Sequence, residues 1–230
     1  MRTSAPILLR VWGPTACFTR PDLKVDRVSF DMITPSAARG ILESILWKPE
    51  MRWVIQSIEL LAPIRTQTLT INELKSRASG QNIMQVISPP EGDGLKRRDV
   101  QVCIDIGADR TQRTSTILRD VDYLIGACIE IRDGMPDVAV RKYDEMFRRR
   151  ASKGQFYHSP CLGQKEHAAD FRLVENRADA PSAIPVDRDL GLLPYAVHAE
   201  NGAVSPSYIR GCLTQGRLEV PPPNSREVLR

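Results

Sequence analysis

The fold is decided by the stretch TILRDVDYLIGACIEIRD, residues 116–133. Apolar and β-branched residues alternate along it, which is typical of a long strand with a buried face. A second stretch of this kind, RWVIQSIELLAPI, occupies residues 52–64. Between the two predicted strands lies a polar insertion, residues 66–113, which contains SPPEGDGLKRRD. We expect this insertion to be mostly loop, with a single strand near residues 100–106.

Upstream of this pair, the sequence predicts a strand and then a helix. The short apolar run PILLRVWG, residues 6–13, is typical of a buried strand. Thr34, Pro35 and Ser36 then form a helix-start signal. After it, apolar residues recur at helical spacing until Lys48 and Pro49 end the pattern.

A second helix is predicted at residues 136–152. Its apolar stripe consists of Ala139 and the apolar residues four, seven and eight positions after it, Tyr143, Met146 and Phe147. The loop QFYHSPCLG follows, and it leads into a predicted strand within CLGQKEHAADFRLVE.

The order of elements is therefore strand, helix, strand, strand, helix, strand. This βαββαβ order predicts an α+β fold of the ferredoxin-like type, which RNA-recognition-motif domains share. A stretch rich in Ala, Asp and Pro at residues 176–184 marks a domain boundary. We expect residues 1–176 to form the ferredoxin-like domain. Residues 184–230 are expected to form a small β-sheet domain with an extended or disordered end.

The composition argues against a membrane-spanning, secreted or disulfide-rich protein. The chain has 230 residues, 42% of them hydrophobic, which is enough for a core. No run of apolar residues is long enough to span a membrane, and the first residues lack the layout of a signal peptide, so we expect a cytoplasmic protein. The five cysteines are scattered without a CxxC pair, which argues against a disulfide framework or a zinc site and favours buried thiols.

The second helix carries more positive charge than a net charge of +4 requires. Basic side chains on a helix are often only a solvated face. Six cations within residues 141–153 nevertheless repel one another unless an anion neutralises them, which favours a phosphate backbone as partner. Nearby aromatic residues suit single-stranded RNA, because bases stack on rings, although core packing explains Tyr143 and Phe147 equally well.

Four separated segments resemble a known family. They are ESILWKP (43–49), LRDVDYLI (118–125), RKYDEMFRRRASKGQFYHSPCLGQKEHAADF (141–171) and RDLGLLPYAV (188–197). In this order they are similar to the subtype I-C, or Dvulg "d"-type, branch of the Cas-five family of CRISPR-associated proteins. The resemblance implies a ferredoxin-like domain followed by a smaller β-rich domain.

The resemblance also implies a function. Members of this branch are metal-independent endoribonucleases that cut precursor CRISPR RNA beside the repeat hairpin. They then retain the 5′ tag as subunits of the surveillance complex. Such chemistry requires a base for the 2′-hydroxyl, an acid for the leaving oxygen and a cation for the phosphate, and it requires neither a metal nor another cofactor.

Site residues follow from the same resemblance. The family's catalytic tyrosine falls on Leu46, and its Lys-His pair before a tyrosine falls on Arg141 and Lys142, followed by Tyr143. We therefore expect Arg141, Lys142 and Tyr143 to lie nearest the scissile phosphate. The expected RNA contacts are Lys48, Arg148, Arg149, Lys153, Phe156 and His158.

The sequence is also compatible with two other functions. The departures at Leu46 and Lys142 favour a non-catalytic scaffold subunit that caps the RNA tag and docks a partner subunit. The basic helix also permits a general nucleic-acid binder, with duplex DNA among its ligands. Trp47 and Trp53 are both expected to lie in the core.

Overall fold

A computed structural model of the protein describes residues 2–23, 26–76, 80, 105–131, 138–200 and 203–229. The chain divides into two compact units. Met1–Gln67 and Thr116–Arg230 make up the first unit, and Thr68–Ser115 make up the second. All of the predicted site residues belong to the first unit.

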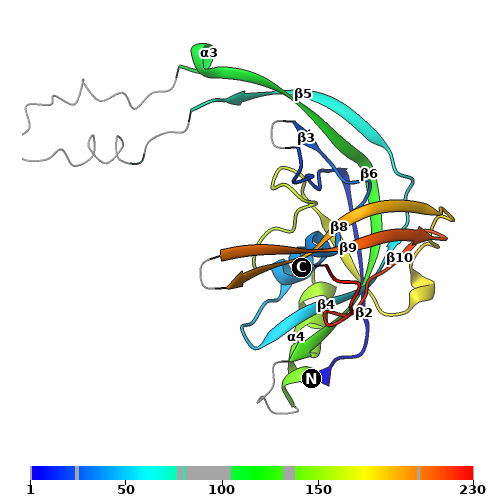
Figure 1. Ribbon diagram of the computed structural model, residues 1–230. Coiled ribbons are helices and arrows are strands. Elements are labelled where there is room, and N and C mark those ends of the chain that lie inside the picture. Colours follow the sequence, from blue (N-terminus) through cyan, green and yellow to red (C-terminus); the bar gives the residue numbers. More distant parts are fainter. Residues whose placement is uncertain are drawn as a thin grey trace, which may run out of the picture. The chain divides into compact units, whose positions relative to one another are not determined.

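Strands dominate the described part of the chain (Figure 1). They are β1 (Arg2–Thr3), β2 (Ile7–Ala16), β3 (Arg27–Val28), β4 (Met51–Leu60), β5 (Thr66–Leu74), β6 (Arg110–Ile131), β7 (Asp170–Val174), β8 (Arg188–Glu200), β9 (Ala203–Thr214) and β10 (Arg217–Glu219). The helices are α1 (Pro35–Ile45), α3 (Ile106–Asp109), α4 (Val138–Ser152) and the single 3-10 turn η1 (Arg177–Asp179).

The first unit has the predicted ferredoxin-like core. In chain order its main elements are β2, α1, β4, β6, α4 and β7, and the sheet order is β7-β2-β6-β4. Each neighbouring pair is antiparallel. Numbered by chain order, these four strands lie in the sequence 4-1-3-2, which is the arrangement expected of a βαββαβ fold. The prediction from element order is confirmed.

Both long helices form where apolar spacing predicts them. Thr34 caps α1 by accepting a hydrogen bond from the Ala37 N–H at 3.2 Å, and Pro35 occupies the first turn, where its missing N–H costs nothing. Helix α4 buries Ala139, Tyr143 and Phe147 of its predicted stripe and half-buries Met146, and Phe147 meets Trp53 of β4 edge to face with 4.6 Å between ring centroids. The helices contact each other, while α1 packs on β4 and α4 on β7.

The C-terminal strands extend the same sheet. They are β10, which lies between β4 and β9, and β9 and β8 beyond it, with β8 against α1. The buried Glu59 of β4 pairs with Arg177 of η1 and with Arg217 of β10, which ties the connecting segment to this junction. A domain boundary between residues 176 and 184 stays a prediction.

Several local expectations were wrong. Strand β5 and the start of β6 occupy part of the insertion that was expected to be loop. The strand expected at 100–106 lies mostly outside the described residues, and Ile106 begins α3. Within CLGQKEHAADFRLVE, where the last strand of the core was expected, only Asp170–Val174 form a strand, β7, and residues 162–167 form turns and bends. Near the C-terminus, Leu229 is ordered through two hydrogen bonds of 2.8 Å with Tyr208.

Candidate functional site

The three residues expected at the scissile phosphate follow one another on α4 but have different environments. Arg141 is 84% exposed in its side chain and pairs with Glu145, one turn along, at 2.7 Å. Lys142 is exposed, and its ammonium lies 5.5 Å from the centroid of the Tyr143 ring. Tyr143 itself is only 7% exposed, because it belongs to the buried stripe. Cations are therefore accessible at this end of α4, whereas the phenol is largely covered.

The hydroxyl of Tyr143 lies beside Glu50. Burial raises the pKa of Tyr143, and the charge and hydrogen bond of Glu50 raise it further. The phenol consequently stays protonated at neutral pH and is unsuited to accept a proton. This contact also brings α4 beside the turn after α1, which carries the exposed Lys48.

The position that matches the family's tyrosine belongs to the core. Leu46 is fully buried at the end of α1, and its carbonyl accepts a hydrogen bond of 2.9 Å from the Trp53 indole. Trp53 is 2% exposed, as expected, whereas Trp47 is 58% exposed, which corrects its assignment to the core. The aromatic side chain available at this end of α1 is therefore Trp47.

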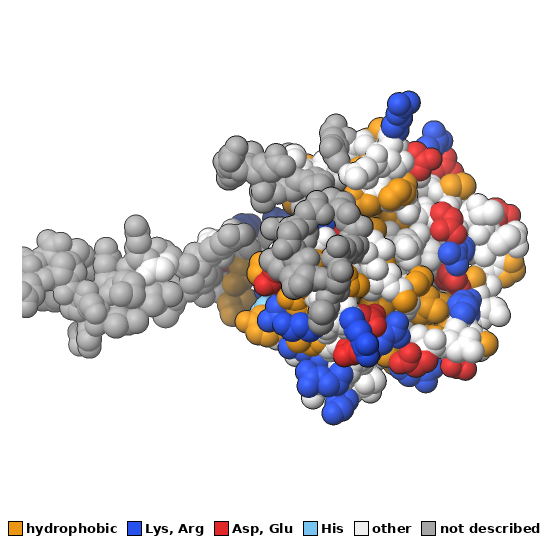
Figure 2. All heavy atoms as spheres, turned by 90° about the horizontal axis from the view of Figure 1, so that it is seen from below, with side chains coloured by type: hydrophobic (Ala, Val, Ile, Leu, Met, Phe, Trp, Pro, Cys, Tyr) orange, Lys and Arg blue, Asp and Glu red, His pale blue; other side chains and the backbone are white. Residues whose placement is uncertain are grey.

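The other cations of α4 divide between structural and free roles. Arg148 bonds to Asp144 and Glu175, each at 3.0 Å, and Arg150 donates to the Ile45 carbonyl at 2.9 Å, which joins α4 to α1. Arg149 is exposed and lines a shallow pocket of about 550 Å³ with Arg141 and Lys142 among others. Lys153 is exposed at the end of the helix. On the face shown in Figure 2, basic side chains gather toward the lower part, and acidic ones lie beside many of them.

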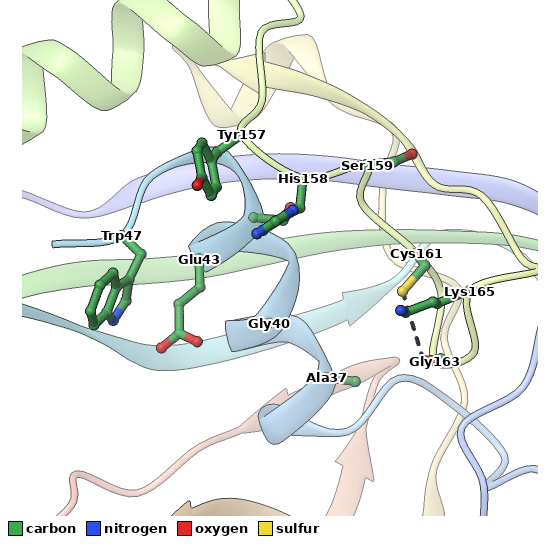
Figure 3. A pocket seen from close by; sticks show the side chains of 11 residues that line it. Ala37, Gly40, Glu43, Trp47, Tyr157, His158, Ser159, Cys161, Gly163 and Lys165 are labelled. Atoms are coloured by element: carbon green, nitrogen blue, oxygen red, sulfur yellow. Dashed lines mark hydrogen bonds between the residues drawn. The ribbon is translucent and has the colours of Figure 1, made fainter. Parts of the chain in front are cut away.

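A larger pocket of about 870 Å³ lies between α1 and the loop that follows α4 (Figure 3). The backbone N–H groups of Tyr157 and His158 both donate to the Ser44 carbonyl, at 2.8 and 3.2 Å, and this fixes the loop on the end of α1. At one end of the pocket lie Trp47, Tyr157 and Glu43, and at the other lie Cys161 and Lys165. His158 lines the same pocket.

Aromatic rings and the carboxyl group of Glu43 line one end of this pocket. The rings of Tyr157 and His158 meet edge to face, with centroids 4.4 Å apart. Partial burial raises the pKa of Glu43 above its usual range, and Arg39 offsets this only in part. Phe156, although 50% exposed, rests against Phe171 at 6.5 Å between centroids and does not line the pocket.

The structure thus separates the predicted residues into a cationic end of α4 and an aromatic pocket that contains His158. Sequence reasoning missed Glu43 and Lys165, assigned Trp47 to the core, and counted Tyr157 only among the rings near the basic helix. Helical spacing could not have indicated Glu43 and Trp47, because Glu43 lies on α1 whereas Trp47 follows the end of that helix, after Leu46 in an extended conformation.

The described residues also bear on metals, membranes and thiols. Within the described ranges, no three His, Cys, Asp or Glu side chains are grouped as a metal site would require. None of the described helices combines the length and apolarity needed to cross a membrane. Cys17 and Cys128 are buried thiols as expected, Cys161 is partly buried, Cys212 is exposed, and Cys103 lies outside the described residues.

Similar proteins agree with the resemblance seen in the sequence. A family model described as CRISPR-associated protein (Cas_Cas5), of the Cas5d type, matches residues 6–218. A protein of Mannheimia succiniciproducens named CRISPR pre-crRNA endoribonuclease Cas5d is 40% identical over 97% of this chain and 98% of its own length. A Thermus thermophilus protein of the same name is 38% identical over 73% of this chain and 63% of its own length.

Solved structures share the fold. One, described as a CRISPR-associated protein, superposes over 100% of this chain and 99% of its own with a TM-score of 0.68 at 17% identity. Another, a functionally uncharacterized protein from Streptococcus mutans, covers 100% of both chains with a TM-score of 0.67 at 18% identity. With a family model that matches nearly the whole chain and a relative at 40% identity, this protein belongs to the Cas5 family of CRISPR-associated proteins, in its d-type branch of subtype I-C.

Proposed function

We propose that this protein binds CRISPR repeat RNA and cleaves precursor CRISPR RNA. The observation that carries the proposal is the 40% identity, along almost the entire chain, to a protein named as a pre-crRNA endoribonuclease. The accessible cations Lys142 and Arg149 on α4 and the exposed rings of Trp47 and Tyr157 support it. Phosphates pair with such cations and unpaired bases stack on such rings.

The reaction is an attack by the ribose 2′-hydroxyl on the adjacent phosphorus, which forms a 2′,3′-cyclic phosphate and breaks the bond from phosphorus to the 5′-oxygen. The 2′-hydroxyl loses its proton to a base, such as water, and the departing 5′-oxygen gains one. Negative charge builds on the phosphate oxygens, and Lys142 with Arg141 would stabilise it. Tyr143, kept protonated beside Glu50, would hold the helix in place and serve at most as a proton donor. These roles need no metal ion.

After the cut, the protein would keep the 5′ tag within a type I-C surveillance complex. Its partners would be the repeat RNA and the other subunits of that complex. Because precursor RNA is made and processed in the cytoplasm, the protein would act there.

The test is cleavage of end-labelled repeat RNA from the protein's own CRISPR locus in excess EDTA. A parallel substrate carries a 2′-deoxy nucleotide at the cut. We expect a single cut that leaves a 2′,3′-cyclic phosphate and that the deoxy substitution abolishes. Tight binding without a cut would instead identify a scaffold subunit, which the buried Leu46 would explain.

A further inference from the structure

The pocket between α1 and the loop after α4 has the size and rigidity of a ligand site. Its volume of about 870 Å³ falls within the range common for small-molecule sites. Its two walls are held together by the bonds from the N–H groups of Tyr157 and His158 to the Ser44 carbonyl. The Arg150 guanidinium, bonded to the Ile45 carbonyl, anchors the same end of α1 to α4. The walls are therefore formed before any ligand arrives.

Two aromatic rings at this pocket are left open to solvent. Trp47 is 58% exposed and Tyr157 is 78% exposed, although a core role would have buried them as it buries Trp53. The Tyr157 ring is supported from one side by His158, edge to face. Exposed, supported rings are the platforms on which proteins stack unpaired bases, and each such contact contributes substantially to affinity.

Polar groups lie at both ends of the pocket. Glu43 is at the aromatic end, where its carboxylate lies 3.5 Å from the Arg39 guanidinium and retains lone pairs that can accept hydrogen bonds from the amino group of a base. Lys165 is at the opposite end, where an exposed ammonium can pair with a phosphate. A nucleotide has its base at one end and its phosphate at the other. In this pocket the base would therefore face the rings and Glu43, and the phosphate would face Lys165.

We propose that this pocket binds one unpaired nucleotide of the RNA, with its base against Trp47 and Tyr157 and its phosphate at Lys165. The inference rests on the proposed function and gives that function a site distinct from the cations on α4. Glu43 would favour a base that has an amino group on its pairing edge, so uracil would bind most weakly.

The first experiment uses short unstructured RNA, which does not depend on recognition of the repeat. Labelled tetranucleotides of A, C or U are titrated with the protein and followed by fluorescence anisotropy. Trp47→Ala and Tyr157→Ala should each weaken binding of the C tetramer about 10-fold, whereas Trp47→Phe should retain most of it. Leu192→Ala is the matched control, because this β8 side chain is 55% exposed and lies outside the pocket. Circular dichroism verifies that each variant is folded.

Binding that stays within about twofold of the wild type in both alanine variants would overturn the proposal, since stacking cannot then contribute. So would equal affinity for the U and C tetramers in the wild type together with no change in Glu43→Gln.

A second experiment separates this proposal from the proposed function. Repeat RNAs with single abasic positions are tested on the wild type and on Trp47→Ala. At one position, removal of the base should weaken binding to the wild type. The same removal should cause no further loss in Trp47→Ala, because the variant has already lost the contact between that base and the ring. If the repeat is cut normally and no position behaves in this way, the pocket proposal is wrong and the function stands. If the repeat is neither bound nor cut but tetramers bind through Trp47, the function is wrong and the pocket stands.

Discussion

Glu59 shows how much one buried carboxylate can organise. Its side chain is 7% exposed and accepts hydrogen bonds from two arginines, Arg177 before the C-terminal strands and Arg217 within them. The Oε1 atom of Glu59 accepts from both arginines, and Oε2 accepts a second bond from Arg177. A glutamine has one acceptor oxygen and no charge, so Glu59→Gln would leave at least one donor of Arg177 facing an amide group and would remove the charged partner of both guanidinium groups. We expect a loss of about 2 kcal/mol in the free energy of unfolding, measured by denaturant titration.

The control for Glu59→Gln is the same substitution at Glu219, which is a second partner of Arg217. Glu219 pairs with the same arginine but is 72% exposed. Exposed pairs contribute little because water competes for them, so Glu219→Gln should change stability by less than about 0.5 kcal/mol. Equal losses in the two variants would show that burial of Glu59 is not the cause.

His167 makes stability depend on pH. It is 9% exposed, and its Nδ1 atom lies 2.7 Å from the Thr15 hydroxyl. Burial lowers the pKa of His167 below its ordinary value of 6.5, partly offset by Glu166. The unfolded chain then binds a proton more readily than the folded one, so this contribution to stability is present above pH 6.5 and is lost as pH falls through the lower, folded pKa.

The prediction for His167 is a difference in how the free energy of unfolding depends on pH between the wild type and His167→Gln. Unfolding free energies are measured from about pH 7.5 to about pH 5 for the wild type and for His167→Gln, which cannot titrate. The wild type should lose more stability on acidification than the variant does. Parallel curves would mean that the imidazole has the same pKa in both states.

Helix α4 has some cations exposed to solvent and others bonded within the fold. Lys142 is exposed and has no carboxylate among its described contacts, whereas Arg148 bonds to Asp144 and Glu175. We expect Lys142→Ala to slow RNA cleavage about 100-fold, since a charge on the reacting phosphate would be left without its cation. Its thermal unfolding should not change.

Arg148→Ala is the matched comparison on the same helix. It should lower stability by about 1 kcal/mol, because two ion pairs are lost, and should affect cleavage less than Lys142→Ala does. Single-turnover cleavage and thermal melts on the two proteins measure both effects. Normal cleavage by Lys142→Ala would remove this lysine from the reaction.

At the scale of elements, the sequence predicted what periodicity encodes. The stripe of α4 and the Thr34 cap of α1 were correct because both depend on residues close in sequence. Strand β5 was missed because TQTLTINEL is polar, and its residues alternate between exposed and half-buried rather than exposed and buried. The pocket was missed for another reason: Trp47 and Tyr157 are 110 positions apart, and contacts between distant residues, namely the bonds to the Ser44 carbonyl and from Arg150 to the Ile45 carbonyl, bring their segments together.

At the scale of the whole molecule, the position of the C-terminal strands decides how the protein unfolds. β10 pairs with β4, and Leu218 of β10 and Ile209 of β9 are buried in the same core cluster as Ile58. The amide of Ile184 also donates to the Leu60 carbonyl at 2.8 Å. These contacts favour one cooperative unit over two domains, even though the composition of residues 176–184 suggests a boundary.

A truncated chain tests this cooperativity. A protein that ends at residue 183 lacks β8, β9 and β10, so the edge of β4 loses its hydrogen-bonding partner and Ile58 becomes exposed. We expect it to aggregate or to unfold without a sigmoidal transition, because an unpaired apolar edge strand is a site of association. A chain that ends at residue 220 retains β10 and should melt cooperatively, only slightly below the full protein. Sharp, cooperative unfolding of the shorter chain would instead establish residues 184–230 as a separate domain.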